Sequence, residues 1–100
     1  MIGARIAFLR RRMGLSQAEL SACLAVSPAA VGAYEQGRRL PSAAVLVLLS
    51  QTFQISVDYL LTGQPIDRRE LALAVEYAAC TDSDGRHILA LQLLEVLTAD

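Results

Sequence analysis

The side chains best suited to bind an anion lie beside expected helix ends. Arg38 and Arg39 fall in a stretch that reads as a loop. Gln17 stands at the start of an expected helix, where free backbone N–H groups and the positive end of the helix dipole favour a phosphate. These residue types at these places could bind phosphate groups.

The arginine triplet at positions 10–12 allows two interpretations. It could form a phosphate patch, or a solvated face from which one arginine makes a structural ion pair. Three consecutive side chains on a helix point in three directions, so at most two can face one partner. Arg11 is kept as a candidate DNA contact.

Charge is distributed unevenly along the chain. Residues 1–65 carry six arginines against three acids, a net charge of +3, whereas residues 66–100 carry three arginines against seven acids, a net charge of −4. The asymmetry indicates that only the first part meets nucleic acid.

Catalytic and metal-binding patterns are missing from the sequence. It has one histidine, His87, with no nucleophile–base constellation, Gly-rich phosphate loop or Cys/His cluster. We expect no enzyme, metal or cofactor. Cys23 and Cys80 are expected to pack as small apolar residues. No apolar run could span a bilayer and no early stretch reads as a signal peptide, so we expect a soluble cytoplasmic protein without membrane contact.

The elements that must position these residues are all helices. Apolar residues recur at helical spacing over 2–13, ending at Met13, and again from Val45 to Phe53. Helix starts are expected at Ser16 (a capping box with Glu19), Ser27 followed by Pro28, Ser42, Ser56 and Asp67 with Glu70, and a last helix over 86–98. In the fourth helix the positions expected to face inward are Val45, Leu46, Leu48, Leu49 and Phe53. No stretch shows strand alternation.

The second and third helices, 16–24 and 28–36, are short and joined by a tight turn. Such a pair can project its second helix into a DNA major groove. Together with the flanking helices, the stretch 2–63 resembles the phage-repressor/Cro (Xre-like) family. The residues that carry the resemblance are Arg5-Ile6, Leu9-Arg10, Gly14 to Leu20, Val26-Ser27, Val31, Tyr34 to Gly37, Arg39, Pro41-Ser42 and Ser56 to Gly63.

The resemblance implies an all-α fold, a five-helix lambda-repressor-like bundle over 1–64. The helix signals after Pro65 predict that a two-helix extension over 65–100 follows it. The resemblance also implies that Gln17 approaches the DNA backbone and sometimes a base edge, that Arg38 and Arg39 lie near the backbone, and that Arg10 and Glu35 form a buried ion pair between the first and third helices. The positions at or beside the groove are Ser27, Pro28, Ala29, Gly32, Ala33 and Gln36.

The sequence departs from the family at this reading surface. Positions 28, 29, 32 and 33 usually carry polar side chains, but here they are Pro, Ala, Gly and Ala, which offer no donor or acceptor to a base edge. Ala25 occupies a turn position that usually holds glycine, so strain or a changed turn is expected there.

Two interpretations follow. Either DNA is bound mainly through phosphates and shape, with base contacts limited to Gln17, Ser27, Gln36 and thymine methyl groups, or specific DNA binding is lost and the domain contacts proteins. We favour the first because the loop arginines remain.

The last helix is apolar around most of its surface, so it needs burial on more than one side, against the preceding helix and against either the first domain or a second chain. We expect a second chain to cover it, so that the two-helix extension over 65–100 forms a homodimer interface at Ile88, Leu91, Leu94 and Leu97. The leading hypothesis is thus a dimeric transcriptional regulator, usually a repressor, bound to double-stranded DNA. The alternative is an antitoxin or protein-interaction module on the same fold, with a protein partner on the C-terminal helices.

Overall fold

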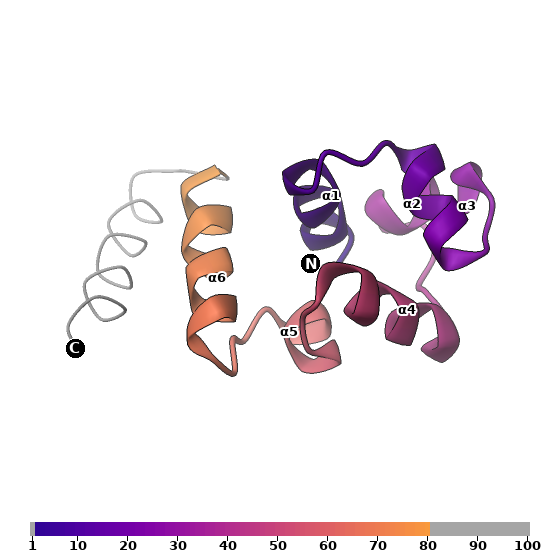
Figure 1. Ribbon diagram of the computed structural model, residues 1–100. Helices are drawn as coiled ribbons and strands as arrows, with labels where there is room; N and C mark the ends of the chain where they lie inside the picture. Colours follow the sequence, from indigo (N-terminus) through magenta and orange to yellow (C-terminus); the bar gives the residue numbers. More distant parts are fainter. Residues whose placement is uncertain (1, 81–100) are drawn as a thin grey trace. The chain divides into compact units, whose positions relative to one another are not determined.

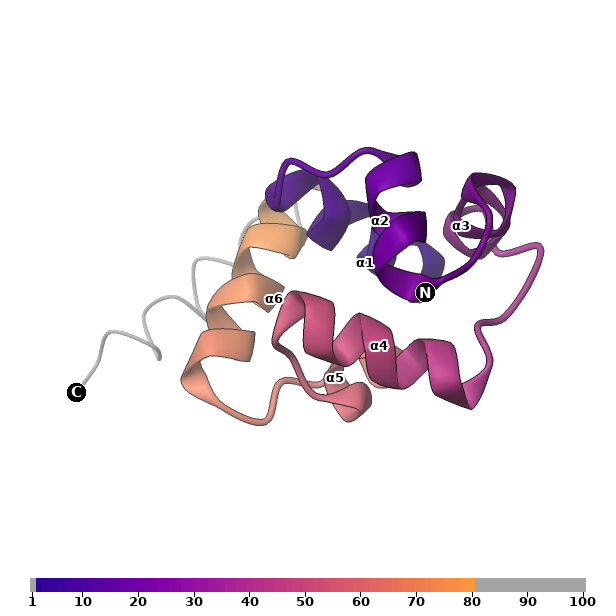
Figure 2. The same cartoon turned by 45° about the vertical axis from the view of Figure 1, so that its right-hand side comes forward.

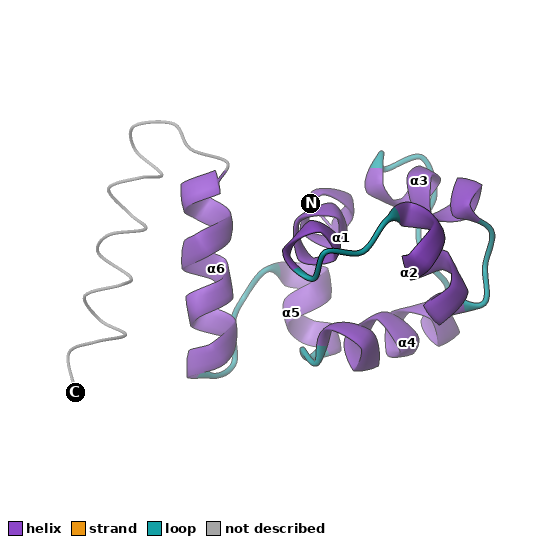
Figure 3. Cartoon of the chain, turned by 45° about the horizontal axis from the view of Figure 1, so that its top comes forward, coloured by secondary structure: helices purple, strands orange, loops and turns teal. Residues whose placement is uncertain are grey.

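The structure, a computed structural model, describes residues 2–80 and is built of helices (Figure 1). Within these residues there is no strand, and the connections are short loops (Figure 3). The all-α fold class is therefore confirmed. The helices are α1 (Ile2–Arg12), α2 (Gln17–Leu24), α3 (Pro28–Glu35), α4 (Ala43–Phe53), α5 (Val57–Thr62) and α6 (Arg68–Cys80).

Four serines begin four of the helices by the same local contact. In each case the serine Oγ accepts the backbone N–H three residues later, at distances of 3.0, 3.1, 3.3 and 3.0 Å in chain order. The four are Ser16, Ser27, Ser42 and Ser56. Such caps satisfy N–H groups that have no partner within the helix, and so set where each helix begins.

Two compact units divide the chain, an N-terminal unit (Met1–Gly63) and a C-terminal unit (Gln64–Asp100). Helices α1–α5 make up the N-terminal unit. In it α3 packs on α1 and α2, while α5 packs on α1 and α4, and α4 also contacts α2 (Figure 2). The side chains most deeply buried at the centre of this unit are Ile6, Leu20, Leu24, Val31, Leu49, Tyr59 and Leu60.

Three apolar side chains are less buried than the sequence pattern suggested. Met13 is exposed, because α1 ends at Arg12 and the chain turns away at Gly14. On α4, Leu46 and Leu48 are only partly buried, since the buried positions Val45, Leu49 and Phe53 follow a narrow i, i+4, i+8 stripe.

The expectation that both cysteines pack as small apolar residues is wrong. Cys23 and Cys80 are exposed. On α2 the buried positions are Leu20, Ser21 and Leu24, so Cys23 falls outside the stripe that faces the core. Ser21 occupies a buried position instead, and its hydroxyl donates to the carbonyl of Ala18 at 2.7 Å.

In the C-terminal unit, α6 begins as the Asp67–Glu70 pattern predicts. The backbone N–H of Glu70 donates to Asp67 Oδ1 at 2.8 Å, and Glu70 Oε1 accepts the N–H of Ile66 at 3.0 Å. This pairing leaves the Glu70 carboxylate buried, together with Leu73. The expected last helix and its dimer residues lie outside the described residues.

No helix in the described part of the chain is both long and apolar enough to cross a membrane. The same stretch, residues 2–80, holds no cluster of three or more His, Cys, Asp or Glu side chains that could bind a metal ion.

Candidate nucleic-acid interface

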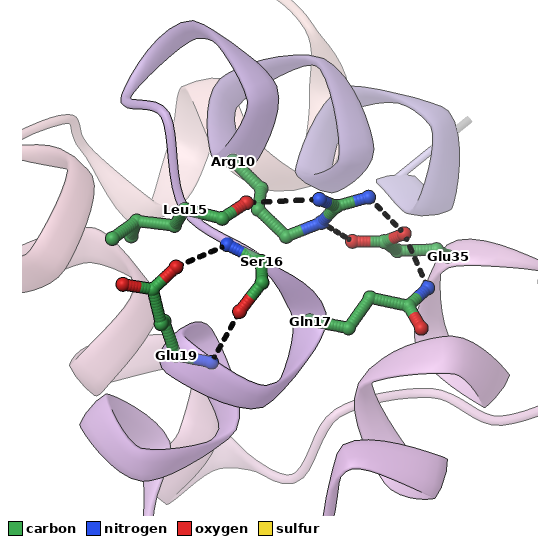
Figure 4. Close-up of polar contacts among 6 residues, drawn as sticks. All are labelled: Arg10, Leu15, Ser16, Gln17, Glu19 and Glu35. Atoms are coloured by element: carbon green, nitrogen blue, oxygen red, sulfur yellow. Dashed lines mark hydrogen bonds and ion pairs between the residues drawn. The ribbon is translucent and has the colours of Figure 1, made fainter.

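The start of α2 is fixed by a complete capping box. Ser16 Oγ accepts the N–H of Glu19 at 3.0 Å, and Glu19 Oε1 accepts the N–H of Ser16 at 2.9 Å (Figure 4). These hydrogen bonds with Ser16 lower the pKa of Glu19 from its ordinary value. Gln17 is therefore held as the first residue of α2.

The turn that joins α2 to α3 passes through Ala25 in the left-handed region, at φ 54° and ψ 40°. The N–H of Val26 donates to the carbonyl of Ser21 at 3.1 Å, which closes the end of α2. Ser27 then caps α3, and Pro28 occupies its first turn. The turn keeps its helix-turn-helix form although alanine replaces glycine, and the left-handed backbone carries the strain that the sequence indicated.

The two faces of α3 differ in exposure. Ala30, Val31 and Tyr34 are buried and face α1 and α2. Pro28 and Ala29 are exposed, Gly32 and Ala33 are partly exposed, and Ser27 and Gln36 are exposed at the two ends. The expected reading positions on α3 and at its two ends are therefore all accessible, and Gln17 lies outside this helix, at the start of α2.

A single carboxylate links the first three helices. Glu35 on α3 receives two bonds from Arg10 on α1, Nε to Oε2 at 2.6 Å and Nη2 to Oε1 at 3.1 Å. Glu35 Oε1 also accepts Nε2 of Gln17 on α2 at 3.0 Å (Figure 4). The ion pair implied by the resemblance is present, and both side chains are largely buried, with 11% of Arg10 and 6% of Glu35 exposed.

The contacts at this junction favour the charged forms of both Glu35 and Arg10. Burial raises the pKa of Glu35, but hydrogen bonds from Arg10 and Gln17, with the charges of Arg10 and Arg11, outweigh it and leave the pKa below its ordinary value. The hydrogen bond to Glu35 raises the pKa of Arg10. Arg10 Nη1 also donates to the carbonyl of Leu15 at 2.9 Å, so Arg10 has a structural role.

The other candidate cations remain accessible to solvent. Arg11, Arg38 and Arg39 are all exposed. Arg38 and Arg39 lie just beyond the end of α3, after Gln36 and Gly37, and the backbone N–H groups of both donate to the carbonyl of Ala33, at 2.9 and 3.3 Å. The Arg39 guanidinium lies 5.8 Å from the centre of the Tyr34 ring, a cation–π contact that restrains it beside α3.

Sequence reasoning missed the role of Arg5, which was counted among the positive charges and among the residues that carry the resemblance but was given no contact. Arg5 is buried, with 5% exposed, and its Nε donates to the carbonyl of Tyr59 at 3.2 Å. Its guanidinium also lies 5.9 Å from the centre of the Tyr59 ring. Arg5 thus ties α1 to α5 within the bundle. Its place among the residues that carry the family resemblance was the only signal available.

Gly3 also escaped notice. A Cβ atom there would lie 2.4 Å from the carbonyl oxygen of Tyr34 and 2.6 Å from that of Glu35. The end of α3 therefore rests directly on the backbone of α1, and only glycine allows this approach. The contact sets the position of α3, and with it the position of the accessible face.

Comparison with known proteins agrees with this geometry. The family model described as "Helix-turn-helix" matches residues 6–60. Repressor protein C2 of Salmonella phage P22 is 35% identical over 63 residues, which make up 63% of this chain and 29% of that protein. The match therefore spans less than a third of the length of that relative. No solved structure gives a significant match. The sequence, the helix-turn-helix geometry and both comparisons show that the chain belongs to the phage-repressor (Xre-like) helix-turn-helix family.

Proposed function

We propose that this chain is a DNA-binding transcriptional regulator that inserts α3 into the major groove of double-stranded DNA. The observation that carries the proposal is the accessible face of α3. The Arg10–Glu35–Gln17 junction fixes the position of this helix, and Arg38 and Arg39 lie exposed just beyond its end. The matched relative from phage P22 is named a repressor, which supports repression as the direction of control.

Each polar group at the site has a separate task in this proposal. Arg38, Arg39 and Arg11 contact phosphates, which contribute affinity without reading sequence. Gln17 bonds Glu35 through Nε2, and this bond orients its carboxamide beside α3 for contact with the backbone or a base edge. Ser27 and Gln36 flank the apolar centre of the face and add polar contacts at its ends.

We further propose that the chain binds as a homodimer, through the apolar positions Ile88, Leu91, Leu94 and Leu97. A two-fold dimer presents two copies of α3 to two half-sites about one helical turn of DNA apart. The proposal of a dimer rests on the sequence pattern of the last predicted helix alone.

The test is the salt dependence of binding to duplex DNA. The logarithm of the binding constant should fall steeply with the logarithm of salt concentration, because cations on DNA are released. Arg39→Ala should reduce the slope by about 0.9 for each protomer bound. Arg69→Ala is the matched control, since Arg69 is exposed on α6 in the other unit, and its slope should equal that of the wild type.

One observation favours a second candidate. Pro28, Ala29, Gly32 and Ala33 lack hydrogen-bonding side chains. Such a face would also fit an antitoxin or another protein-binding module built on this fold. That module would have weak or no sequence specificity on DNA, so it would bind all duplexes with similar affinity. Unchanged affinity in both Arg39→Ala and Gln17→Ala would likewise contradict the DNA contacts proposed here.

A further inference from the structure

The centre of the accessible face of α3 is apolar and made of small residues. Pro28, Ala29, Gly32 and Ala33 lie together at helical spacing, and none has a side-chain donor or acceptor. The polar groups lie around them: Ser27 and Gln36 at the two ends of the helix, Gln17 beside it, and Arg38 and Arg39 beyond its end. A face of this composition cannot form hydrogen bonds with a base edge, but it can contact an apolar group closely.

Gly32 is not required by the fold. A Cβ atom there would meet only the Gln17 carboxamide, at 3.8 and 3.9 Å, which is ordinary van der Waals contact. Its φ angle is not positive, unlike those of Gly14, Gly37 and Gly63. Glycine weakens a helix relative to alanine, so nothing within residues 2–80 accounts for its presence here. The space it leaves lies on the outer side of α3.

We propose that α3 reads DNA through the C5-methyl groups of thymine, which pack against Gly32 and the small side chains of Pro28, Ala29 and Ala33. The inference rests on the proposed function of DNA binding. Among the groups exposed in the major groove, the thymine methyl is the apolar one, and the other base edges offer donors and acceptors that this face cannot satisfy. The flanking arginines make DNA, rather than an apolar protein surface, the occupant that the charges fit.

The small size of these residues also sets how closely α3 can approach DNA. Small residues let the backbone of α3 lie nearer the floor of the groove than a helix with long side chains could. Methyl contacts are short-ranged, and they contribute only when the surfaces meet at van der Waals distance. Gly32 therefore provides space at the point where the helix and a methyl group come closest.

The first experiment removes the methyl group from the DNA alone. Sites are selected with the full chain from a random duplex pool, and each thymine of a selected site is replaced in turn by deoxyuridine. Pairing is kept and one methyl is lost, so the affinity should fall about fourfold at each contacted thymine. Placing 5-methylcytosine in contacted positions that hold cytosine should strengthen binding by a similar factor.

The second experiment fills the space at position 32. Gly32→Ala should raise Tm by about 4 °C, because alanine favours the helix and meets no clash. The same variant should bind the selected site at least several-fold more weakly, with unchanged binding to non-specific DNA. The control is Gln54→Gly, which relieves a left-handed residue at the end of α4 and should leave site affinity unaltered.

The outcomes separate the two proposals. Equal affinity for thymine and deoxyuridine at every position, with binding still selective, would overturn methyl reading and leave DNA binding in place. Undiminished site affinity in Gly32→Ala would likewise overturn the close approach at position 32. Absence of salt-dependent binding to any duplex would overturn the proposed function itself, and would assign the apolar face to a protein contact.

Discussion

At the scale of residues, the carboxylate of Glu35 joins three helices. It accepts Arg10 of α1 and Gln17 of α2 from its own place at the end of α3. Local sequence rules do not reveal such a junction, because the three residues are separated by up to 25 positions. Family resemblance indicated the Arg10–Glu35 pair, but not the bond from Gln17.

The pKa of Glu35 leads to a prediction about acid stability. Its folded pKa lies below the ordinary value of 4.5, so its contribution to stability is fully present above pH 4.5. That contribution is lost as the pH falls from 4.5 through the folded pKa. Glu35→Gln should lower the free energy of unfolding at pH 7 by about 3 kcal/mol, since it breaks a buried ion pair.

Urea unfolding of both proteins at several pH values measures this effect. The difference between wild type and Glu35→Gln should shrink steadily below pH 4.5. Glu76→Gln serves as the control, because Glu76 is exposed on α6 and its substitution should change stability little at any pH. A Glu35→Gln difference that stays constant down to the lowest pH would contradict the assigned role of the carboxylate.

At the scale of elements, helix starts were predictable from the sequence and helix packing was not. Each of the serine caps depends on a backbone N–H three residues away, so a short stretch of sequence contains the whole signal. The contact of Gly3 with the backbone of Tyr34 and Glu35 depends on residues more than 30 positions away. Periodicity placed the helices but could not indicate how closely two of them approach.

The close approach of α1 and α3 predicts opposite effects for two identical substitutions. Gly3→Ala should destabilise the protein by about 3 kcal/mol, because its Cβ would press on backbone carbonyls that cannot yield without moving α3. Gly32→Ala should stabilise it by about 1 kcal/mol, because alanine has a higher helix propensity than glycine and its Cβ meets no clash. Urea midpoints of the two variants measure both effects. The packing described for α1 would be wrong if Gly3→Ala were as stable as the wild type.

At the scale of the molecule, the family fold and the place of the accessible face were both predictable, because they depend on a whole series of motifs. Residues that act between distant helices, such as Arg5, were not, since nothing in the neighbouring sequence indicates a partner 54 positions away. The reading surface of Pro28, Ala29, Gly32 and Ala33 was visible in the sequence. Its interpretation as a surface for close contact required the structure, which gives the exposure of each residue and the open space at Gly32.

The division into two units leads to a prediction about assembly. The N-terminal unit has its own core, built on Ile6, Val31, Leu49 and Leu60, so residues 1–65 should fold alone and remain monomeric.

The full chain should be a dimer of twice 10.8 kDa, because the apolar residues expected in its last helix require cover from a second copy. Light scattering measures the mass of the 1–65 fragment and of the full chain, and circular dichroism measures their helix content. The double substitution Leu91→Glu with Leu94→Glu should convert the full chain to a monomer. A full chain that is monomeric at micromolar concentration would contradict the predicted dimer, whereas a dimeric 1–65 fragment would place the interface in the N-terminal unit.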